Sequence, residues 1–144
     1  FYLSRNGKLN KNKFGKKIYL SREGKIRNVI EDQKIYKFLK NLGYRKLICE
    51  NYKISEQIEF IKNSRIVVAP GGAALANLIF AKNKIKVIVI TSFKKYGEGL
   101  YYLPSLLGGN KIEMNYFFGT KKNSFYVHSD FNINLKKLKK LFNK

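Results

Sequence analysis

The chain has few of the residues from which disulfides and metal sites are built. Its 144 residues include one cysteine, Cys49, one histidine, His128, and nine acidic residues. A lone cysteine cannot form an intramolecular disulfide, so a reducing compartment such as the cytoplasm is the default expectation. The acidic residues are scattered and contain no D-x-D pair. We therefore expect neither a zinc site nor a magnesium ion beside a diphosphate, and we expect no cofactor.

The sequence also lacks the common signatures of nucleotide binding and of nucleophilic hydrolysis. Neither G-x-G-x-x-G nor G-x-x-x-x-G-K-[ST] occurs, which argues against NAD or ATP bound in the ways that those motifs provide. His128 is far along the chain from any nucleophile turn, so no Ser/His/Asp arrangement is indicated. We interpret this histidine as structural and assign no catalytic residue.

Long hydrophobic runs and a leader sequence are missing too. No apolar run reaches the roughly 20 residues that a membrane-spanning helix requires, and the N-terminus does not resemble a signal peptide. The chain opens with Phe1, and its one methionine is Met114. We therefore expect a fragment of a longer cytoplasmic protein, inactive alone.

Positive charge is abundant. Thirty lysine and arginine residues against nine acidic ones give a net charge of +21, and such a surplus attracts polyanions or acidic membrane surfaces. The lysines are spread along the chain, which a lysine-rich composition alone would explain. No zinc-finger, RNP or recognition-helix pattern occurs, so no nucleic-acid partner is expected. The lysine-rich face of the last expected helix, at residues 134–144, predicts peripheral contact with an acidic inner membrane leaflet.

The most informative stretch reads RIVVAPGGAALANLIFAK. An apolar run typical of a buried strand (residues 66–69) is broken by Pro-Gly-Gly, and a helix that is apolar nearly all round follows (residues 73–82). Glycine lets the backbone approach a ligand closely and take a positive φ. The first helical turn offers unpaired amides at the positive end of the helix dipole and holds no acidic residue. The pattern predicts an anion site at Gly71, Gly72 and Ala73.

A plain strand-to-helix turn is the alternative interpretation of this stretch. In that case Asn77, the one polar side chain of the helix, is hydrogen-bonded to a neighbouring loop, because a buried amide needs a partner. These residues alone leave both interpretations open.

Strands alternate with helices along the chain, which predicts an α/β fold: a Rossmann-like, mostly parallel sheet with helices on both faces. We expect this domain at residues 16–144, after a remnant of a preceding element and a basic loop at residues 1–15. Further strands are expected at residues 17–21, 45–50, 86–91, 111–118 and 124–128. Further helices are expected at residues 31–42, 55–64 with Ser55 as the cap, 101–107 and 135–142.

The expected strand order brings two distant turns together. In the order second, first, third, fourth, the ends of the first and third strands lie side by side, where α/β sheets bind ligands. The polar turn at residues 22–28 then meets the Pro-Gly-Gly turn. Arg22 and Arg27 offer forked donors to a diphosphate there. The alternatives are a solvated turn for Arg22 and, for Arg27, an ion pair with Glu31 four residues on.

The segments KIYLSREGKIRNVIED, ISEQIEFIKNSRIVVAPGGAALANLIF and KVIVI resemble the family-61 glycosyltransferases, which include bacterial capsular-polysaccharide transferases. The resemblance covers residues 17–91 and continues weakly into the closing FYVHSDFNINLKKLKKL. The matching motif positions are Tyr19, Ser21, Arg22, Arg27, Glu31, Glu56, Gln57, Gly72, Ala73, Leu75 and Asn77. One position departs, because Gly71 stands where the family usually has a histidine. No proton transfer or donor contact that rests on that histidine carries over.

The resemblance implies the C-terminal half of a GT-B glycosyltransferase, which has two Rossmann-like domains and works without a metal. It implies transfer of a sugar, with inversion, from a nucleotide-sugar to a growing polysaccharide or lipid-linked glycan. The implied donor-binding residues are Ser21, Arg22, Arg27, Glu31, Gly71, Gly72, Ala73 and Asn77. Glu31 would orient Arg27 or contact the donor, and the general base would lie on the missing N-terminal half.

Two other classes of function stay open. A non-catalytic Rossmann-like partner domain would explain the fold and the loss of the loop histidine. A basic nucleic-acid-binding module would explain the charge but not the glycine turn.

Overall fold

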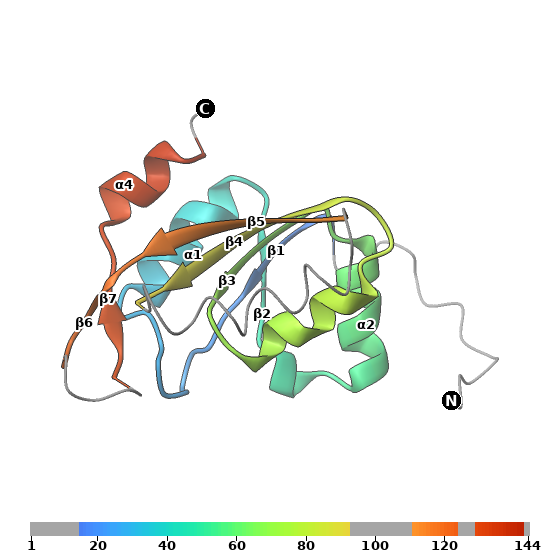
Figure 1. Cartoon of the computed structure of the whole chain (residues 1–144), viewed down its shortest axis with the longest axis horizontal. Helices are drawn as coiled ribbons and strands as arrows, with labels where there is room; N and C mark the ends of the chain where they lie inside the picture. The colour runs from blue at the N-terminus through green and yellow to red at the C-terminus, as the bar shows by residue number, and fades with distance from the viewer. Residues whose placement is uncertain (1–14, 93–110, 124–128, 143–144) are drawn as a thin grey trace.

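The structure, a computed structural model, describes residues 15–92, 111–123 and 129–142 (Figure 1). The expected helix at residues 101–107, the expected strand at residues 124–128 and most of the N-terminal segment of residues 1–15 lie outside the described residues. No described helix is long and apolar enough to cross a bilayer.

Five parallel strands form the central sheet in the order β2-β1-β3-β4-β5. Their bounds are Lys17–Leu20 (β1), Arg45–Leu47 (β2), Ile66–Pro70 (β3), Ile85–Thr91 (β4) and Ile112–Phe118 (β5). The expected order of the first four strands is confirmed, and so is the α/β class with a mostly parallel sheet. β3 and β4 lie inside the sheet, as their nearly continuous apolar sequences predict.

Helices cover both faces of this sheet, as expected (Figure 1). Successive side chains of a strand point to opposite faces, so Ile18 and Leu20 enter one core while Tyr19 enters the other. The first core is completed by α2 (Ile54–Asn63) and the 3-10 helix η2 (Ala73–Phe80). The second is completed by α1 (Asp32–Asn41) and α4 (Leu135–Lys140). Each fully buried aliphatic side chain stabilises the fold by about 1.5–3 kcal/mol.

The helix α1 begins and ends where its residues predict. Asp32 lies in the first turn, where a carboxylate faces the positive end of the helix dipole. Ile35 and Leu39 are fully buried four residues apart, on one side of the helix. Leu42 is the C-cap, and Gly43 follows with a φ of 81°, the left-handed conformation that favours glycine.

The helix α2 starts earlier than expected. Lys53 is the N-cap, and its amide donates a hydrogen bond of 3.1 Å to the Glu56 carboxylate. The expected cap at Ser55 was wrong. The helix begins after Lys53 because the Glu56 side chain, three residues on, accepts the hydrogen bond of the Lys53 amide. The strand before α2 is also shorter than expected. It ends at Leu47, and the 3-10 helix η1 (Cys49–Asn51) replaces its last residues.

The helix η2 is a half-exposed 3-10 helix rather than a buried α-helix. Residues three apart lie on one side of a 3-10 helix, and Leu75 and Leu78 are buried at that spacing, whereas Ile79 is 43% exposed. The expectation of a fully buried helix was wrong because one side of η2 packs against the core and the other faces away from it.

A small antiparallel sheet was not expected. β6 (Thr120–Lys121) pairs with β7 (Phe131–Asn132), and Phe131 also forms a parallel bridge with Val29. The helix α4 follows, with the Asn134 side chain accepting a hydrogen bond of 3.0 Å from the Lys137 amide. The expected last helix is therefore confirmed, and the bridge ties this C-terminal part to the loop before α1.

Candidate functional site

The C-terminal ends of β1 and β3 lie next to each other, as expected. The two strands pair in parallel, with Ile18 opposite Val67 and Tyr19 opposite Val68. The chain therefore leaves β1 at Ser21 and leaves β3 at Gly71 on the same edge of the sheet. This edge is where ligands of α/β sheets bind.

The side chain of Arg22 lies directly over Gly72. A Cβ atom on Gly72 would be 1.9 Å from Nη1 of Arg22 and 3.0 Å from its Cζ, so glycine is what permits this approach. The other terminal nitrogen of Arg22, Nη2, donates a hydrogen bond of 3.1 Å to the Ile26 carbonyl. Gly72 itself is extended, with a φ of 167°. Gly72 therefore does not use the positive φ that glycine allows. The close approach of the Arg22 guanidinium is instead the reason for a glycine at this position.

The amides around this glycine differ in what they offer a ligand. The Gly71 amide donates a hydrogen bond of 2.9 Å to the Ile90 carbonyl and so continues the pairing of β3 with β4. Among the described residues, no acceptor is bonded to the amides of Gly72 and Ala73. The first turn of η2 contains no acidic residue. Arg22 and these two amides together can bind an anion such as a phosphate.

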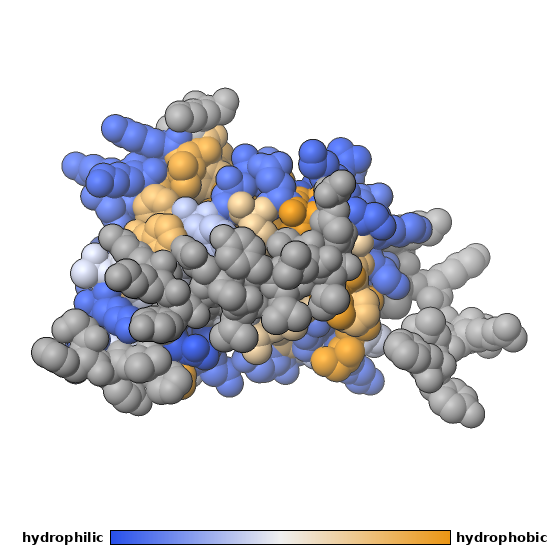
Figure 2. Space-filling view, in the orientation of Figure 1, coloured by the Kyte–Doolittle hydropathy of each residue, from blue (hydrophilic) through white to orange (hydrophobic). Residues whose placement is uncertain are grey.

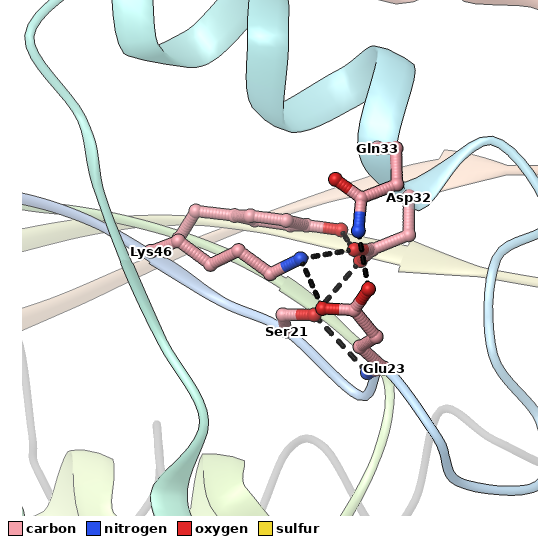
Figure 3. Close-up of polar contacts among 6 residues, drawn as sticks. Ser21, Glu23, Asp32, Gln33 and Lys46 are labelled. Carbon is pink, nitrogen blue, oxygen red and sulfur yellow. Dashed lines mark hydrogen bonds and ion pairs between the residues drawn. The ribbon is translucent and has the colours of Figure 1, made fainter.

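A buried carboxylate lies beside this turn. Asp32 is 3% exposed, and three donors converge on it (Figure 3). Its Oδ1 accepts hydrogen bonds from the Tyr19 hydroxyl at 2.5 Å and the Ser21 hydroxyl at 3.0 Å. Its Oδ2 is 2.7 Å from Nζ of Lys46. Lys46 lies opposite Tyr19 in the pairing of β2 with β1, which explains why both side chains reach the same carboxylate.

The same network continues to Glu23. Nζ of Lys46 is 2.7 Å from a Glu23 carboxylate oxygen, and the Gln33 side chain donates to the other oxygen. The hydrogen bond from Lys46 is the main cause that lowers the pKa of Glu23. Burial alone would lower the pKa of Lys46, but its bonds to Asp32 and Glu23 outweigh burial and raise that pKa. Lys46 is therefore a firmly charged bridge between the two carboxylates.

The sequence did not single out Asp32 or Lys46 for this role. A signal was present at the end of β1, where Tyr19 and the following Ser21, two residues apart, place two hydroxyl groups on one side of the chain. Such groups need a partner, and Asp32 supplies it.

Arg27 has an unusual backbone and an unsatisfied side chain. Its φ is 59°, a conformation that few residues other than glycine adopt. Its Nε atom, like Oδ1 of the adjacent Asn28, is buried without a hydrogen-bond partner. Among the described residues, no ion pair joins Arg27 to Glu31. The alternative of an ion pair between them is therefore not observed, and Nε of Arg27 stays without a partner among the described residues.

The loop that carries Arg27 is held by the C-terminal part of the chain. The Asn28 amide donates to the Asp130 carboxylate at 2.8 Å, and the Phe131 amide donates to the Asn28 carbonyl at 3.1 Å. The Ile133 amide donates to the Glu31 carboxylate at 3.0 Å. Glu31 is therefore bonded to the backbone of a distant segment. We call residues 130–133 the strap, and the sequence did not predict it.

Asn77 is engaged away from this turn. Its amide nitrogen donates a hydrogen bond of 2.8 Å to the Gln57 side chain. Gln57 in turn donates to the Cys49 carbonyl at 2.9 Å and the Tyr52 carbonyl at 3.1 Å. The interpretation of Asn77 as a structural residue is the one that this geometry supports, with a partner on α2 rather than on a loop.

A hollow of about 620 Å³ lies away from Arg22 and Gly71, at the opposite ends of the strands. Its lining residues are Glu59, Lys62, Asn63, Lys82 and Asn83. The described residues also contain no group of three His, Cys, Asp or Glu side chains that could hold a metal ion.

Comparison with known proteins gives one match. Residues 2–88, more than half of the chain, match the family described as Glycosyltransferase 61. The matched segment includes Arg22, Gly72 and the network around Asp32, and it ends before β5 and the strap. No curated protein matches the sequence.

Proposed function

The chain belongs to the glycosyltransferase 61 family, and from this membership we propose that it binds the nucleotide-sugar donor of a glycosyltransferase. Its partner in the reaction is a growing polysaccharide or a lipid-linked glycan. The observation that carries the proposal is the guanidinium of Arg22 lying over Gly72 at the ligand edge of the sheet.

The proposed chemistry follows from where charge develops. The bond between the anomeric carbon of the sugar and the diphosphate breaks, an acceptor hydroxyl oxygen bonds to that carbon from the opposite side, and the diphosphate gains negative charge. Arg22, the amides of Gly72 and Ala73, and Arg27 stabilise that charge in positions set before the reaction. The proton of the acceptor passes to a base outside the residues assigned to this site.

The setting of this reaction is part of the same proposal. We assign the chain to the C-terminal half of a GT-B enzyme of the bacterial capsule type that needs no metal, at the cytoplasmic side of the membrane. Four exposed lysines on α4, Lys136, Lys137, Lys139 and Lys140, suit an anionic lipid surface. Figure 2 shows hydrophilic side chains gathered at this upper left part of the molecule beside a hydrophobic strip.

A second candidate function rests on Gly71. This residue stands where the resemblance places a histidine, and its amide is already bonded to Ile90. A partner domain that has lost donor binding would tolerate that change. This second candidate predicts that the full-length protein has no affinity for any nucleotide-sugar, whereas the first candidate predicts binding.

The test is titration of UDP-, GDP-, CMP- and dTDP-sugars into the full-length protein and two variants. Arg22→Ala should weaken donor binding by about 1.5–3 kcal/mol, because it removes charged hydrogen bonds. Gly72→Val should do the same, because its side chain would displace the guanidinium. Arg65→Ala, at the opposite end of β3, is the matched control and should bind like the parent. If both site variants bind like the parent while circular dichroism shows them folded, the phosphate site is not here.

A further inference from the structure

The turn that carries Arg22 is fixed on both sides of that residue. Before it, the Ser21 amide donates to the Leu47 carbonyl at 2.8 Å, and the Ser21 hydroxyl donates to Asp32. After it, the Glu23 amide donates to the same Ser21 hydroxyl at 3.1 Å. One hydroxyl therefore brackets Arg22, and its position depends on Asp32.

Asp32 joins three elements at this point. It opens α1, it receives hydroxyl donors from Tyr19 and Ser21 on the β1 segment, and it receives Lys46 from β2. A buried ion pair is often no more stabilising than apolar side chains of similar volume. Stability alone therefore gives little reason for a charged cluster here. The position of the cluster at the ligand edge of the sheet gives a better reason, because the cluster fixes the path of the chain after β1.

Glu23 is the outer end of the cluster. Its side chain is 44% exposed, whereas that of Lys46 is 12% exposed. An exposed ion pair adds little to stability. Lys46 and Gln33 nevertheless hold both carboxylate oxygens of Glu23 (Figure 3). This tether acts on the residue that directly follows Arg22, so it limits the directions in which Arg22 can point.

We propose that Asp32 and Lys46 are positioning residues for the diphosphate site: with Glu23, they hold the turn after β1 so that the guanidinium of Arg22 stays over Gly72. This inference rests on the proposed function for the ligand. The residues act through Arg22 and do not themselves contact the donor.

The experiment compares three variants in the full chain, with UDP and inorganic pyrophosphate as probes. Lys46→Met removes the bridge, Lys46→Arg keeps its charge, and Glu23→Ala removes the exposed tether without leaving a buried charge unpaired. Lys37→Met, an exposed lysine on α1 outside the cluster, is the matched control. Lys46→Met and Glu23→Ala should raise the Kd about tenfold or more, since small displacements of a binding group have effects of this size. Lys46→Arg and Lys37→Met should stay near the parent value.

A double-mutant cycle separates positioning from general damage to the fold. In an Arg22→Ala background, Lys46→Met and Glu23→Ala should change the Kd no further, because the group through which they act is gone. An equal loss in both backgrounds would overturn the inference, and so would unchanged binding by folded variants. If Lys46→Met does not fold, Glu23→Ala carries the same test.

A second measurement distinguishes failure of this inference from failure of the proposed function. If the parent binds neither probe, the proposed diphosphate site fails. The NMR signal of Nε–H of Arg22 in the protein without ligand then tests the positioning. It should be sharp and shifted from the free value in the parent and in Lys37→Met, and broadened or shifted toward the free value in Lys46→Met and Glu23→Ala. Signals that stay the same in all variants would overturn the inference.

Discussion

At the scale of single residues, Arg27 shows how a strained position is maintained. Among the described residues, it is the one residue other than glycine with a positive φ. Such a conformation costs on the order of 1 kcal/mol or more, and its buried Nε adds the cost of an unsatisfied donor. A residue that served stability alone would be glycine here, which supports the proposed role of the Arg27 side chain in donor binding.

We therefore predict opposite effects of Arg27→Gly on stability and on binding. The free energy of unfolding should stay level or rise by up to about 1 kcal/mol, because glycine removes the strain but makes the unfolded chain more flexible. Affinity for a nucleoside diphosphate should fall by about 1.5–3 kcal/mol as a charged donor is lost. Urea denaturation and calorimetric titration measure the two quantities. Lys25→Gly, in the same turn, is the control: it should lower the free energy of unfolding and leave the affinity unchanged. Equal destabilisation by both variants would contradict the prediction.

At the scale of secondary-structure elements, the fold could be predicted where the local pattern of apolar residues determines it. Short, nearly continuous apolar runs identified β3 and β4, and the strand order followed from general rules of α/β connection. Two turns far apart in sequence could therefore be placed together. The contacts of Asp32 with Lys46 could not be predicted, because they depend on the register that sets Lys46 opposite Tyr19 and on side-chain reach across that pair of strands. The strap could not be predicted either, since it joins residues about a hundred positions apart.

The link between η2 and α2 gives a prediction at this scale. Asn77→Ala should lower the free energy of unfolding by about 1–3 kcal/mol, because the half-buried Gln57 side chain loses its partner on η2. Donor affinity should hold, because Asn77 is bonded to α2 and not to the turn of Arg22. Thermal unfolding and donor titration on the same preparation measure both. A loss of affinity with no loss of stability would return Asn77 to the donor site, where the family resemblance had placed it.

At the scale of the whole molecule, several buried groups titrate above neutral pH. Burial raises the pKa of Tyr44 to about 12. Burial, and then the charge of Glu50, raises the pKa of Cys49 to about 11. Burial, followed by Asp32, also raises the pKa of Tyr19 well above its usual value. A group whose pKa is higher in the folded state stabilises the fold below its unfolded pKa, and this contribution is lost as the pH rises toward the folded pKa.

The contribution of these groups to the free energy of unfolding should therefore decline from about pH 9 to about pH 12. Loss of lysine charge over the same range relieves repulsion in a chain of net charge +21 and acts in the opposite direction. The variant Tyr44→Phe isolates the tyrosine, because it removes the titrating hydroxyl and leaves the ring. Urea denaturation of parent and variant at intervals from pH 7 to about 11.5 should show the parent losing more stability than Tyr44→Phe above pH 10. Parallel curves would contradict this assignment.

The charge of the whole molecule also predicts selective binding to anionic membranes. Each lysine near such a surface contributes about 1 kcal/mol, and salt weakens the attraction. Co-sedimentation should therefore be stronger with vesicles containing anionic lipid than with neutral vesicles. Replacing the four lysines of α4 with glutamine should reduce it more than the same change at the exposed Lys34, Lys37, Lys82 and Lys84. Equal binding to both kinds of vesicle would reject a lipid surface as partner.

The strap also sets the order in which the site can be completed during synthesis. The loop of Arg27 receives its backbone partners from residues 130–133, which leave the ribosome about a hundred residues after the loop itself. The backbone pairing of β1 to β4 and the contact of Arg22 with Gly72 involve no residue beyond Thr91. A nascent chain can therefore pair most of the sheet and form this contact early. The loop of Arg27 receives its backbone partners only after residues 130–133 have emerged.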